Sequence, residues 1–257
     1  MRELVSSIMP SFNTGQFIAD AIESVINQSY NNWELIIIDD CSRDNTDDVV
    51  EYYLRDTRIQ YYKNPANMGA AYSRNRALQI AKGKWIAFLD SDDIWHSDKL
   101  KKQITFMENN DLHFSYTNYS EMDEEGNPRN VSWTGPSVIN NKMMMTFNYM
   151  GCLTVMYDSS FIGQIQIKDL KKRNDYAIWL KVVKKSPAYL LKEDLASYRV
   201  RKTGSITDRR KPPLDRIKYN YLLWRLSEEK SALASCILVV INIVFACYKK
   251  IVYKKVT

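Results

Sequence analysis

The sequence predicts an α/β fold built on a doubly wound, mostly parallel sheet. Over the first 95 residues, apolar stretches of strand length alternate with stretches of helical periodicity. The strand stretches, such as Trp33–Asp39, are apolar on both faces, which is typical of a parallel sheet covered by helices on both sides. The alternation indicates successive βαβ units. A length of 257 residues, with 45% hydrophobic residues, suits one such domain and a short appendage.

The strands and helices of this first half follow in a regular order. We expect strands at Leu4–Met9, Trp33–Asp39, Arg58–Tyr62 and Trp85–Leu89. We expect helices over residues 14–29, from Asp44 or Asn45 to Leu54, and from Asn67 to Ala81 with a C-cap at Gly83. Right-handed crossovers bring the carboxyl ends of such strands to one edge of the sheet, where ligands bind.

The second half of the sequence predicts a mixed arrangement. Helices are expected at Lys99–Asn109 and Asp175–Lys185, and strands at His113–Tyr119, Thr154–Tyr157 and Tyr189–Val200. A turn is expected over residues 123–128. The less regular pattern favours a second substrate site in this half.

The tail differs from the rest of the chain. Ser231–Tyr248 carries no charge and has Asn242 near its middle, and four lysines follow it within residues 249–255. This stretch is at the lower limit of length for a bilayer span. An interfacial or re-entrant anchor, a true span and a plain core helix all remain open. The lysines favour contact with an anionic membrane surface.

Charge and cysteine usage exclude several classes of function. The net charge of +6 lies mostly in residues 168–173, 199–211 and 249–255, and the first half has no basic arm with interleaved aromatic residues. We therefore expect no nucleic-acid partner and favour a diphosphate or an anionic lipid. The four cysteines lie far apart, which argues against a zinc site and for reduced thiols. The first apolar run is too short for a signal peptide.

An acidic cluster follows the fourth predicted strand. Asp90, Ser91, Asp92 and Asp93 stand on the loop that leaves it. Two carboxylates in this spacing can hold one Mg²⁺ or Mn²⁺, and the cation can offset charge on a departing diphosphate. Crowded carboxylates are costly without a cation. The alternative is a helix cap, with Ser91 or Asp92 starting the helix that contains Lys99.

Other polar and aromatic residues follow the remaining strand ends. Asp39 and Asp40 can accept a base imide or a ribose hydroxyl, or they cap the next helix. Phe12, after Pro10, offers a flat apolar face for a base, or it packs in the core. Arg74 lies near a helix N-terminus that favours phosphate, or it is an exposed helix arginine.

Two features of the second half suggest chemistry. Asp175 stands ahead of an apolar helix, either as a helix cap or as a general base near an acceptor hydroxyl. The basic stretch Tyr198–Ser205 either folds over a diphosphate or is a solvated turn.

Taken together, these motifs resemble the family 2 glycosyltransferases with the GT-A fold. The match covers roughly residues 4–207, in order and at the expected spacing. The residues that carry it are Val5–Asn13, Ile37–Ser42, Asn67–Gly69, Ala71–Asn75, Phe88–Asp93, Asn174–Tyr176 and Tyr198–Arg199. The resemblance implies an inverting transferase that acts by a single displacement on a nucleotide-diphosphate sugar. It divides the chain into a GT-A domain (1–212), with a nucleotide-binding half (1–95) and an acceptor half (96–212), and a helical membrane-associated tail (213–257).

The resemblance also implies roles for the donor-binding residues. Pro10, Phe12 and Asp40 would hold the base, and Asp39 would support them. Arg74 would lie beside the diphosphate. Many members of the family have a tyrosine at the position of Phe12, a substitution that should change little.

The metal and the base follow from the same resemblance. Asp90 would face the ribose or the metal, and Asp92, with Asp93 beside it, would hold Mn²⁺ or Mg²⁺. Asp175 would deprotonate the acceptor hydroxyl for attack on the anomeric carbon. Many members have Glu-Asp in place of Asn174-Asp175, so only Asp175 can be the base here. Many have a histidine at the position of Arg201, which suggests that Arg201 neutralises the diphosphate instead.

The later motifs look like bacterial enzymes that build lipopolysaccharide O-antigen or teichuronic acid repeats. This likeness implies UDP-glucose or UDP-galactose as donor, N-acetylglucosamine diphosphate on undecaprenol as acceptor, and a β-linked product. It also implies a peripheral or monotopic protein on the cytoplasmic face of the bacterial inner membrane. A nucleotidyltransferase and a non-catalytic nucleotide-sugar-binding membrane module are the alternatives.

Overall fold

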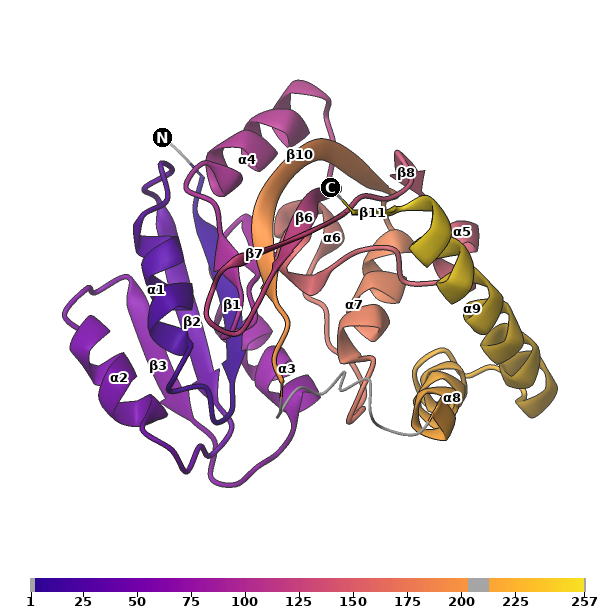
Figure 1. The fold of residues 1–257 in the computed structure, drawn as a ribbon, viewed down its shortest axis with the longest axis horizontal. Helices are drawn as coiled ribbons and strands as arrows, with labels where there is room; N and C mark the ends of the chain where they lie inside the picture. Colours follow the sequence, from indigo (N-terminus) through magenta and orange to yellow (C-terminus); the bar gives the residue numbers. More distant parts are fainter. Residues whose placement is uncertain (1–2, 203–212, 257) are drawn as a thin grey trace.

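The computed structural model describes residues 3–202 and 213–256. Four parallel strands form the core of its first half (Figure 1). Their order across the sheet is β4-β1-β2-β3, and all three pairings are parallel. The doubly wound sheet predicted from the sequence is therefore confirmed. The strands are β1 (Val5–Ser11), β2 (Trp33–Asp39), β3 (Ile59–Lys63) and β4 (Trp85–Phe88).

Helices cover both faces of this parallel core, as its apolar strands require. The helices α1 (Ile18–Ile26) and α2 (Thr46–Tyr53) belong to one hydrophobic cluster, which takes Met9 and Ile37 from the sheet. The helix α3 (Ala70–Ile80) belongs to the other, which takes Ile8, Ile36 and Ile38. Successive strand residues thus point to opposite faces.

Two of the predicted boundaries are wrong for identifiable reasons. The first helix begins only at Ile18, since residues 15–17 form a turn, and the backbone N–H groups of Thr14 and Gly15 bond to Thr46 and Asp44 in the neighbouring loop. Gly83 is not a C-cap, since α3 ends at Ile80 and Ala81 stands in the cap position. Gly83 instead passes close to β1, where an added Cβ would lie 2.5 Å from the backbone N of Ser6.

The second half extends the sheet with strands of mixed direction. The strand β9 (Met156–Asp158) pairs antiparallel with β4 and β6, and the long strand β10 (Ala188–Arg199) pairs parallel with β6 (Phe114–Met122). The further strands are β5 (Ile94–Trp95), β7 (Pro128–Trp133) and β8 (Val138–Ile139). The helical elements are α4 (Lys99–Asn109), α5 (Asn141–Thr146), η1 (Cys152–Thr154), α6 (Ser159–Ile162) and α7 (Asn174–Val183).

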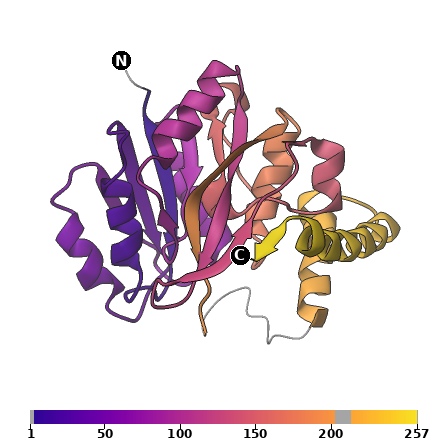
Figure 2. The ribbon, with the colours of Figure 1, turned by 45° about the horizontal axis from the view of Figure 1, so that its top comes forward.

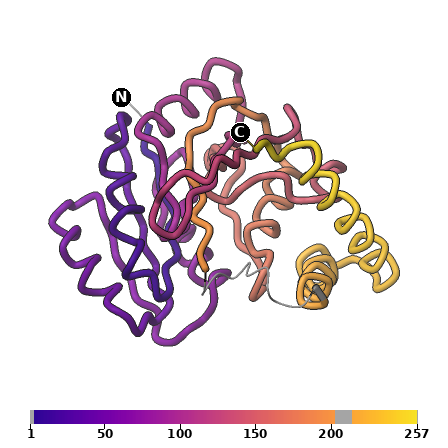
Figure 3. Tube along the Cα trace, viewed as in Figure 1, coloured from indigo at the N-terminus to yellow at the C-terminus, as the bar shows by residue number. Residues whose placement is uncertain are grey.

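The tail packs against the end of the molecule that lies opposite α2 and β3 (Figures 1 and 3). It contains α8 (Pro213–Leu222), the π-helical turn η2 (Leu223–Ser227), α9 (Ala232–Val252) and β11 (Lys254–Val256). The last strand returns to the sheet and pairs antiparallel with β7, so the C-terminal end of α9 is held against the body (Figure 2).

Asn242 fixes the middle of α9 to the body. Its side chain is buried, accepts a hydrogen bond from Trp224 Nε1 at 3.0 Å, and donates to the carbonyls of Met145 and Thr146 at 3.1 and 2.6 Å. The polar residue that interrupts the apolar stretch is thus a docking residue. It satisfies buried polar groups that would otherwise cost free energy.

The opposite face of α9 is apolar and exposed. Among the described helices, α9 is the one long and apolar enough to cross a membrane, and most of it is not buried in the structure. This exposure is incompatible with the alternative of a plain core helix. The exposed residues include Leu233, Ile237, Val240, Val244 and Ile251.

Replacing Asn242 by leucine should loosen the tail. The change leaves Trp224 Nε1 and two buried carbonyls without their partner, and we expect the free energy of unfolding to fall by about 2–4 kcal/mol. Urea unfolding in mild detergent measures the change, with Val244→Leu on the exposed face as the control. An Asn242→Leu protein as stable as the control would show that these hydrogen bonds do not hold the helix.

Candidate active site

The loops that follow β1, β2 and β4 meet at one edge of the sheet. Thr14, after β1, bonds through its hydroxyl to Ser11 at 2.8 Å and to Ser91, after β4, at 3.1 Å. Its backbone N–H donates to the hydroxyl of Thr46, after β2, at 3.2 Å. The predicted convergence of the strand ends is therefore confirmed, and small hydroxyl side chains hold the loops together.

Asp39 and Asp40 both shape this edge. Asp39 is fully buried, and its carboxylate accepts from the backbone N–H and the hydroxyl of Ser42. The carboxylate of Asp40 accepts from the backbone N–H groups of Met68 and Gly69 at 2.8 and 2.7 Å. Neither caps the helix that follows β2, because α2 begins only at Thr46. Asp40 instead fixes the entry to α3.

Phe12 lies on the rim of the same edge. Its ring is 42% exposed, so it is not part of the core. It follows β1, in which Pro10 pairs with Ile38 of β2. A flat apolar ring is therefore presented to solvent beside the loop that contains Asp40, where a base would stack.

The acidic cluster forms a turn and does not cap a helix. The backbone N–H of Asp93 bonds to the carbonyl of Asp90, and α4 begins only at Lys99, with Asp98 in the N-cap position. The carboxylates of Asp90 and Asp92 are partly exposed, whereas Asp93 is buried. Asp90 and Asp92 thus face the site, and Asp93 stands behind them.

Two arginines at the end of β10 hold this turn. The buried Arg199 donates from its backbone N–H to the carboxylate of Asp93 at 2.9 Å and from Nε to the carbonyl of Asp92 at 2.9 Å. Its Nη2 also pairs with Asp20 at 2.7 Å. Arg201 pairs with the carboxylate of Asp92 at 3.3 Å. The rest of the predicted basic loop, from residue 203, lies outside the described residues.

Arg74 connects the acidic turn to the start of α7. Its side chain is buried, and its guanidinium pairs with the carboxylate of Asp90 and donates to the side-chain oxygen of Asn174. Arg74 is therefore not the exposed helix arginine of the alternative reading. Although burial alone would lower the pKa of Arg74, the charges of Asp90 and Asp175 raise it, so the guanidinium stays charged.

Asp175 lies in the first turn of α7, beside this bridge. Its half-buried carboxylate accepts from Asn148 Nδ2 at 3.1 Å, and Arg173, not Asp175, occupies the N-cap position. The side chain therefore faces the segment after α5 and not the helix backbone. This orientation leaves it available to an acceptor hydroxyl.

The electrostatics of the acidic turn suit a divalent cation. Burial and the charge of Asp90 raise the pKa of Asp92, and burial with the charges of Asp92 and Asp90 raises the pKa of Asp93 well above its usual range. Mg²⁺ and Mn²⁺ sites often use one or two carboxylates together with substrate phosphates. Asp90 and Asp92 fit that pattern. No cluster of three or more acidic, histidine or cysteine ligands occurs within residues 3–202 and 213–256.

Cys152 lies close to the carboxylates, and its thiol accepts from Arg74 Nη2 at 3.6 Å. Burial and the charge of Asp90 raise its pKa well above the ordinary value, so the thiol is neutral and is not a nucleophile. All four cysteines are free, as the sequence predicted.

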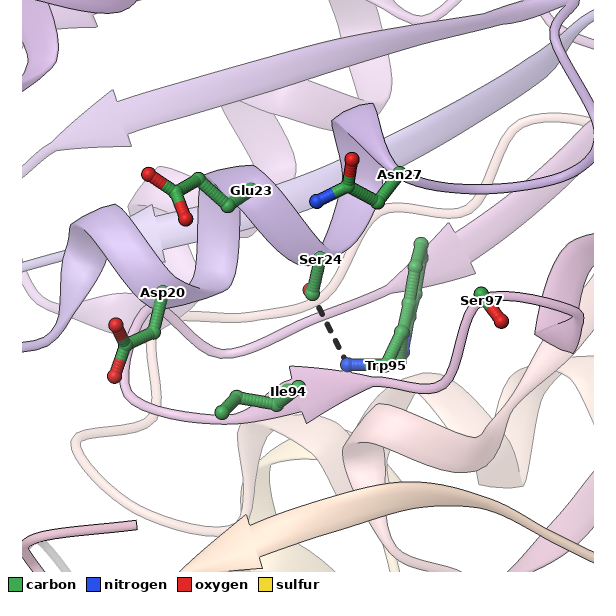
Figure 4. A pocket seen from close by; sticks show the side chains of 7 residues that line it. All are labelled: Asp20, Glu23, Ser24, Asn27, Ile94, Trp95 and Ser97. Atoms are coloured by element: carbon green, nitrogen blue, oxygen red, sulfur yellow. Dashed lines mark hydrogen bonds between the residues drawn. The ribbon is translucent and has the colours of Figure 1, made fainter.

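A separate shallow pocket lies between α1 and β5 (Figure 4). Its two carboxylates already have partners, because Asp20 pairs with Arg199 and Glu23 accepts from the hydroxyl of Tyr53 at 2.8 Å. None of the strand-end aspartates lines it. We therefore place the site at the sheet edge and not in this pocket.

Three contributors to the site were not assigned by the sequence: Arg199, Asn148 and Cys152. Arg199 ends a predicted strand, and no local pattern indicates that its side chain turns toward an acidic loop more than 100 positions earlier. Asn148 and Cys152 lie in a segment without periodicity. Their roles depend on tertiary contacts alone.

Comparison with known proteins decides the family. The family model described as glycosyl transferase family 2 matches residues 6–163. The chain belongs to glycosyl transferase family 2. It is therefore a glycosyltransferase, and neither the nucleotidyltransferase nor the non-catalytic module that the sequence left open.

Two curated relatives match this glycosyltransferase over most of their own length. A putative teichuronic acid biosynthesis glycosyltransferase of Bacillus subtilis, TuaG, is 43% identical over 201 residues, which are 77% of this chain and 80% of the relative. The Escherichia coli protein WfgD, named UDP-Glc:alpha-D-GlcNAc-diphosphoundecaprenol beta-1,3-glucosyltransferase, is 41% identical over 182 residues, 70% of each chain.

Solved structures of low sequence identity share the fold. The structure of Staphylococcus aureus TarS 1–349 in complex with UDP-GlcNAc superposes with a TM-score of 0.73 at 17% identity, covering 98% of this chain and 74% of that one. The Pyrobaculum calidifontis mannosyltransferase PcManGT, solved with GDP-Man and Mn²⁺, gives 0.65 at 13% identity, covering 96% and 76%. The family 2 glycosyltransferase described here thus has the α/β GT-A fold, with a mixed sheet.

A thermal shift experiment tests the metal role of the acidic turn. Mn²⁺ with UDP should raise the melting temperature of the wild-type glycosyltransferase by about 3 °C or more, since a ligand that binds the folded state stabilises it. Asp92→Asn should abolish the Mn²⁺-dependent part of the shift. The control is Asp98→Asn, at an exposed position near the same turn. An equal shift in Asp92→Asn would remove Asp92 from the metal site.

Proposed function

We propose that the protein is an inverting glycosyltransferase that moves glucose or galactose from a UDP-sugar to a lipid-linked acceptor, forming a β-linkage. One observation carries the proposal. Arg74 binds Asp90 of the acidic turn and Asn174, the residue directly before Asp175. The guanidinium of Arg74 therefore links the proposed diphosphate site to the helical turn that carries the proposed base. A single displacement requires the two substrates to be held in such a fixed arrangement.

The donor would lie along the sheet edge. The uracil would stack on the exposed ring of Phe12, near Pro10 and the loop fixed by Asp39 and Asp40. Arg201, which pairs with Asp92, would also donate charge-assisted hydrogen bonds to the diphosphate. A diphosphate at this position brings negative charge to a site that is lined by arginines on two sides.

Asp90 and Asp92 would hold the divalent cation, Mn²⁺ or Mg²⁺, with Asp93 behind them. When bound, the cation offsets the charge on the departing diphosphate. Burial and then the neighbouring charge of Asp90 raise the pKa of Asp92, and a cation held by the two carboxylates would offset their repulsion.

The reaction would proceed in one step. Asp175 takes the proton from an acceptor hydroxyl, and that oxygen attacks the anomeric carbon from the face opposite the diphosphate. The new carbon–oxygen bond forms as the bond between the anomeric carbon and the phosphate oxygen breaks, and UDP leaves. An α-linked donor thus yields a β-linked product.

Support for the donor and the acceptor comes from the relatives. WfgD and a second Escherichia coli protein, WfaP, are 41% and 40% identical, and both are named as UDP-Glc:alpha-D-GlcNAc-diphosphoundecaprenol beta-1,3-glucosyltransferases. We extend this specificity to the present protein as a proposal, with GlcNAc-diphospho-undecaprenol as the acceptor in surface polysaccharide synthesis.

A lipid-linked acceptor requires the protein to reach a membrane, and α9 offers the means. Asn242 docks the helix on α5, and β11 returns to the sheet, so the helix can cross a bilayer only by leaving the body. We therefore favour a monotopic arrangement on the cytoplasmic face of the inner membrane, in which the exposed apolar face of α9 enters the lipid interface.

A transfer assay tests the proposed function. Purified protein with Mn²⁺ should transfer from UDP-glucose or UDP-galactose to a GlcNAc-diphosphate-lipid analogue, and NMR of the product should show a β-linkage. EDTA should stop the reaction, and Mn²⁺ should restore it. An α-linked product, or full turnover in EDTA, would contradict the mechanism.

Asp175→Asn should reduce kcat by at least about 100-fold, because general-base catalysis contributes about that much or more. The amide keeps the size of the side chain, so UDP binding should not change. The control is Asp169→Asn, at an exposed position just before α7. Near wild-type turnover in Asp175→Asn would assign the base to another residue.

The membrane role of α9 is tested by flotation with anionic lipid vesicles. Wild-type protein should float, and the combined change Ile237→Ser, Val240→Ser and Val244→Ser should leave it in the dense fraction, since it removes exposed apolar area that would enter the lipid. The control is Tyr52→Ser, an exposed position on α2. Equal flotation of the triple variant would place the membrane contact elsewhere.

A further inference from the structure

A lysine of the tail reaches the acceptor side of the site. Lys249, in the last turns of α9, is 9% exposed, and its Nζ donates to the backbone carbonyl of Asn148 at 3.4 Å. Trp133 and Phe147 present their ring faces to it, at 5.6 and 5.7 Å from the ring centroids. Within the described residues, no carboxylate lies within ion-pair distance of Lys249. Such a buried cation is costly unless an anion joins it.

Asn148 joins this lysine to the proposed base. Its backbone carbonyl accepts from Lys249, and its side-chain Nδ2 donates to the carboxylate of Asp175 at 3.1 Å. The segment that contains Asn148 lies between α7 and α9, because Tyr176 donates to the carbonyl of Met144 and Asn242 donates to those of the next two residues. The tail therefore forms one wall of the acceptor side.

Arg173 lies near Lys249, and Arg216 lies near Arg173. Arg173 directly precedes α7 in the left-handed conformation, and Arg216 lies on α8. Neither forms an ion pair with any residue in the described ranges. Burial lowers the pKa of Lys249 to about 8, an effect that Asp175 opposes and Arg173 reinforces, and burial together with Arg216 lowers that of Arg173. Arg173 thus repels both Lys249 and Arg216, and Asp175 is the carboxylate that attracts Lys249 and Arg173.

We propose that Lys249, Arg173 and Arg216 form a binding site for the phosphate groups of the acceptor, next to Asp175. This inference rests on the proposed function. An acceptor sugar with its hydroxyl at Asp175 would carry its diphosphate about one ring away, and Asn148, which bonds to both Asp175 and Lys249, places Lys249 beside that position. Charge-assisted bonds to phosphate would satisfy the buried lysine and relieve the repulsion. The lipid chain would then continue along the exposed apolar face of α9, the same helix that carries Lys249.

The apolar tail is accordingly part of the site as well as a membrane contact. The family model ends at residue 163, so it covers none of the three cations. Removing the tail should impair transfer even to a water-soluble acceptor, because the deletion takes away two of the three cations and the partner of Asn148.

Two acceptors and matched variants test the proposal. One acceptor is GlcNAc-α-diphosphate on a short phenoxyalkyl chain, and the other is the neutral octyl glycoside of GlcNAc. In Lys249→Gln and Arg173→Gln, kcat/KM for the diphosphate acceptor should fall about 10- to 100-fold, and about tenfold more than for the neutral acceptor. Lys250→Gln, the exposed next residue, should behave as wild type. Lys249→Arg should recover most of the loss.

Calorimetric titration of the diphosphate acceptor, without donor, keeps the inference separate from turnover. Its Kd should rise at least about tenfold in Lys249→Gln and stay constant in Lys250→Gln. If wild type binds this acceptor but transfers no sugar, the proposed function fails and the phosphate site stands. Equal binding by Lys249→Gln, or an equal loss on both acceptors, would overturn the phosphate site.

Flotation with phosphatidylglycerol vesicles separates the acceptor diphosphate from a phospholipid headgroup. Lys249→Gln should float as wild type does. A variant that loses flotation but keeps its affinity for the diphosphate acceptor would assign the cations to phospholipid and contradict the proposal.

Discussion

The buried guanidinium of Arg74 is the interaction on which the site depends. It binds Asp90 at the end of β4 and Asn174 at the start of α7, two positions on different halves of the fold. Burying an arginine is costly unless its charge is paired, and Asp90 and Asn174 supply partners for Nη2 and Nη1 from the two halves. The same bond orders the acidic turn and the first turn of α7. The proposed metal-binding turn and the proposed base are thereby linked through a single side chain.

The rest of the site follows from the distribution of charge. Parallel strands deliver their carboxylates to one edge, and the resulting repulsion is relieved from two directions. Arg74 approaches from α3, and Arg199 and Arg201 approach from the end of β10. The arginines leave Asp90 and Asp92 partly exposed, in an arrangement suited to a divalent cation and a diphosphate. Around Asp175 the excess charge is positive instead of negative. Lys249 and Arg173 lie near this carboxylate, and neither forms an ion pair within the described part of the chain.

Much of the fold was predictable because its signals are local. The continuous apolar runs of β1, β2 and β4 identify a parallel sheet, and that sheet by itself brings Asp40 and Asp90 to one edge. The two-residue strands β5 and β8 are too short to show periodicity, and α5 lies in a methionine-rich segment without a clear pattern. The pairing of β11 with β7 and the burial of Lys249 arise from contacts more than 100 positions apart, which no local pattern encodes. The apolar composition of the tail indicates a membrane segment and gives no sign that β11 and Lys249 pack against the rest of the protein.

The proposed nucleotide, cation and base meet around Arg74, beside one edge of the sheet. A crystal structure with UDP and Mn²⁺ tests this placement most directly. We expect the uracil against Phe12, the diphosphate between Arg201 and the acidic turn, and Mn²⁺ bound to the carboxylate of Asp92, with Asp175 facing the space beyond the terminal phosphate. A nucleotide bound elsewhere, or Mn²⁺ without contact to Asp90 or Asp92, would contradict the account.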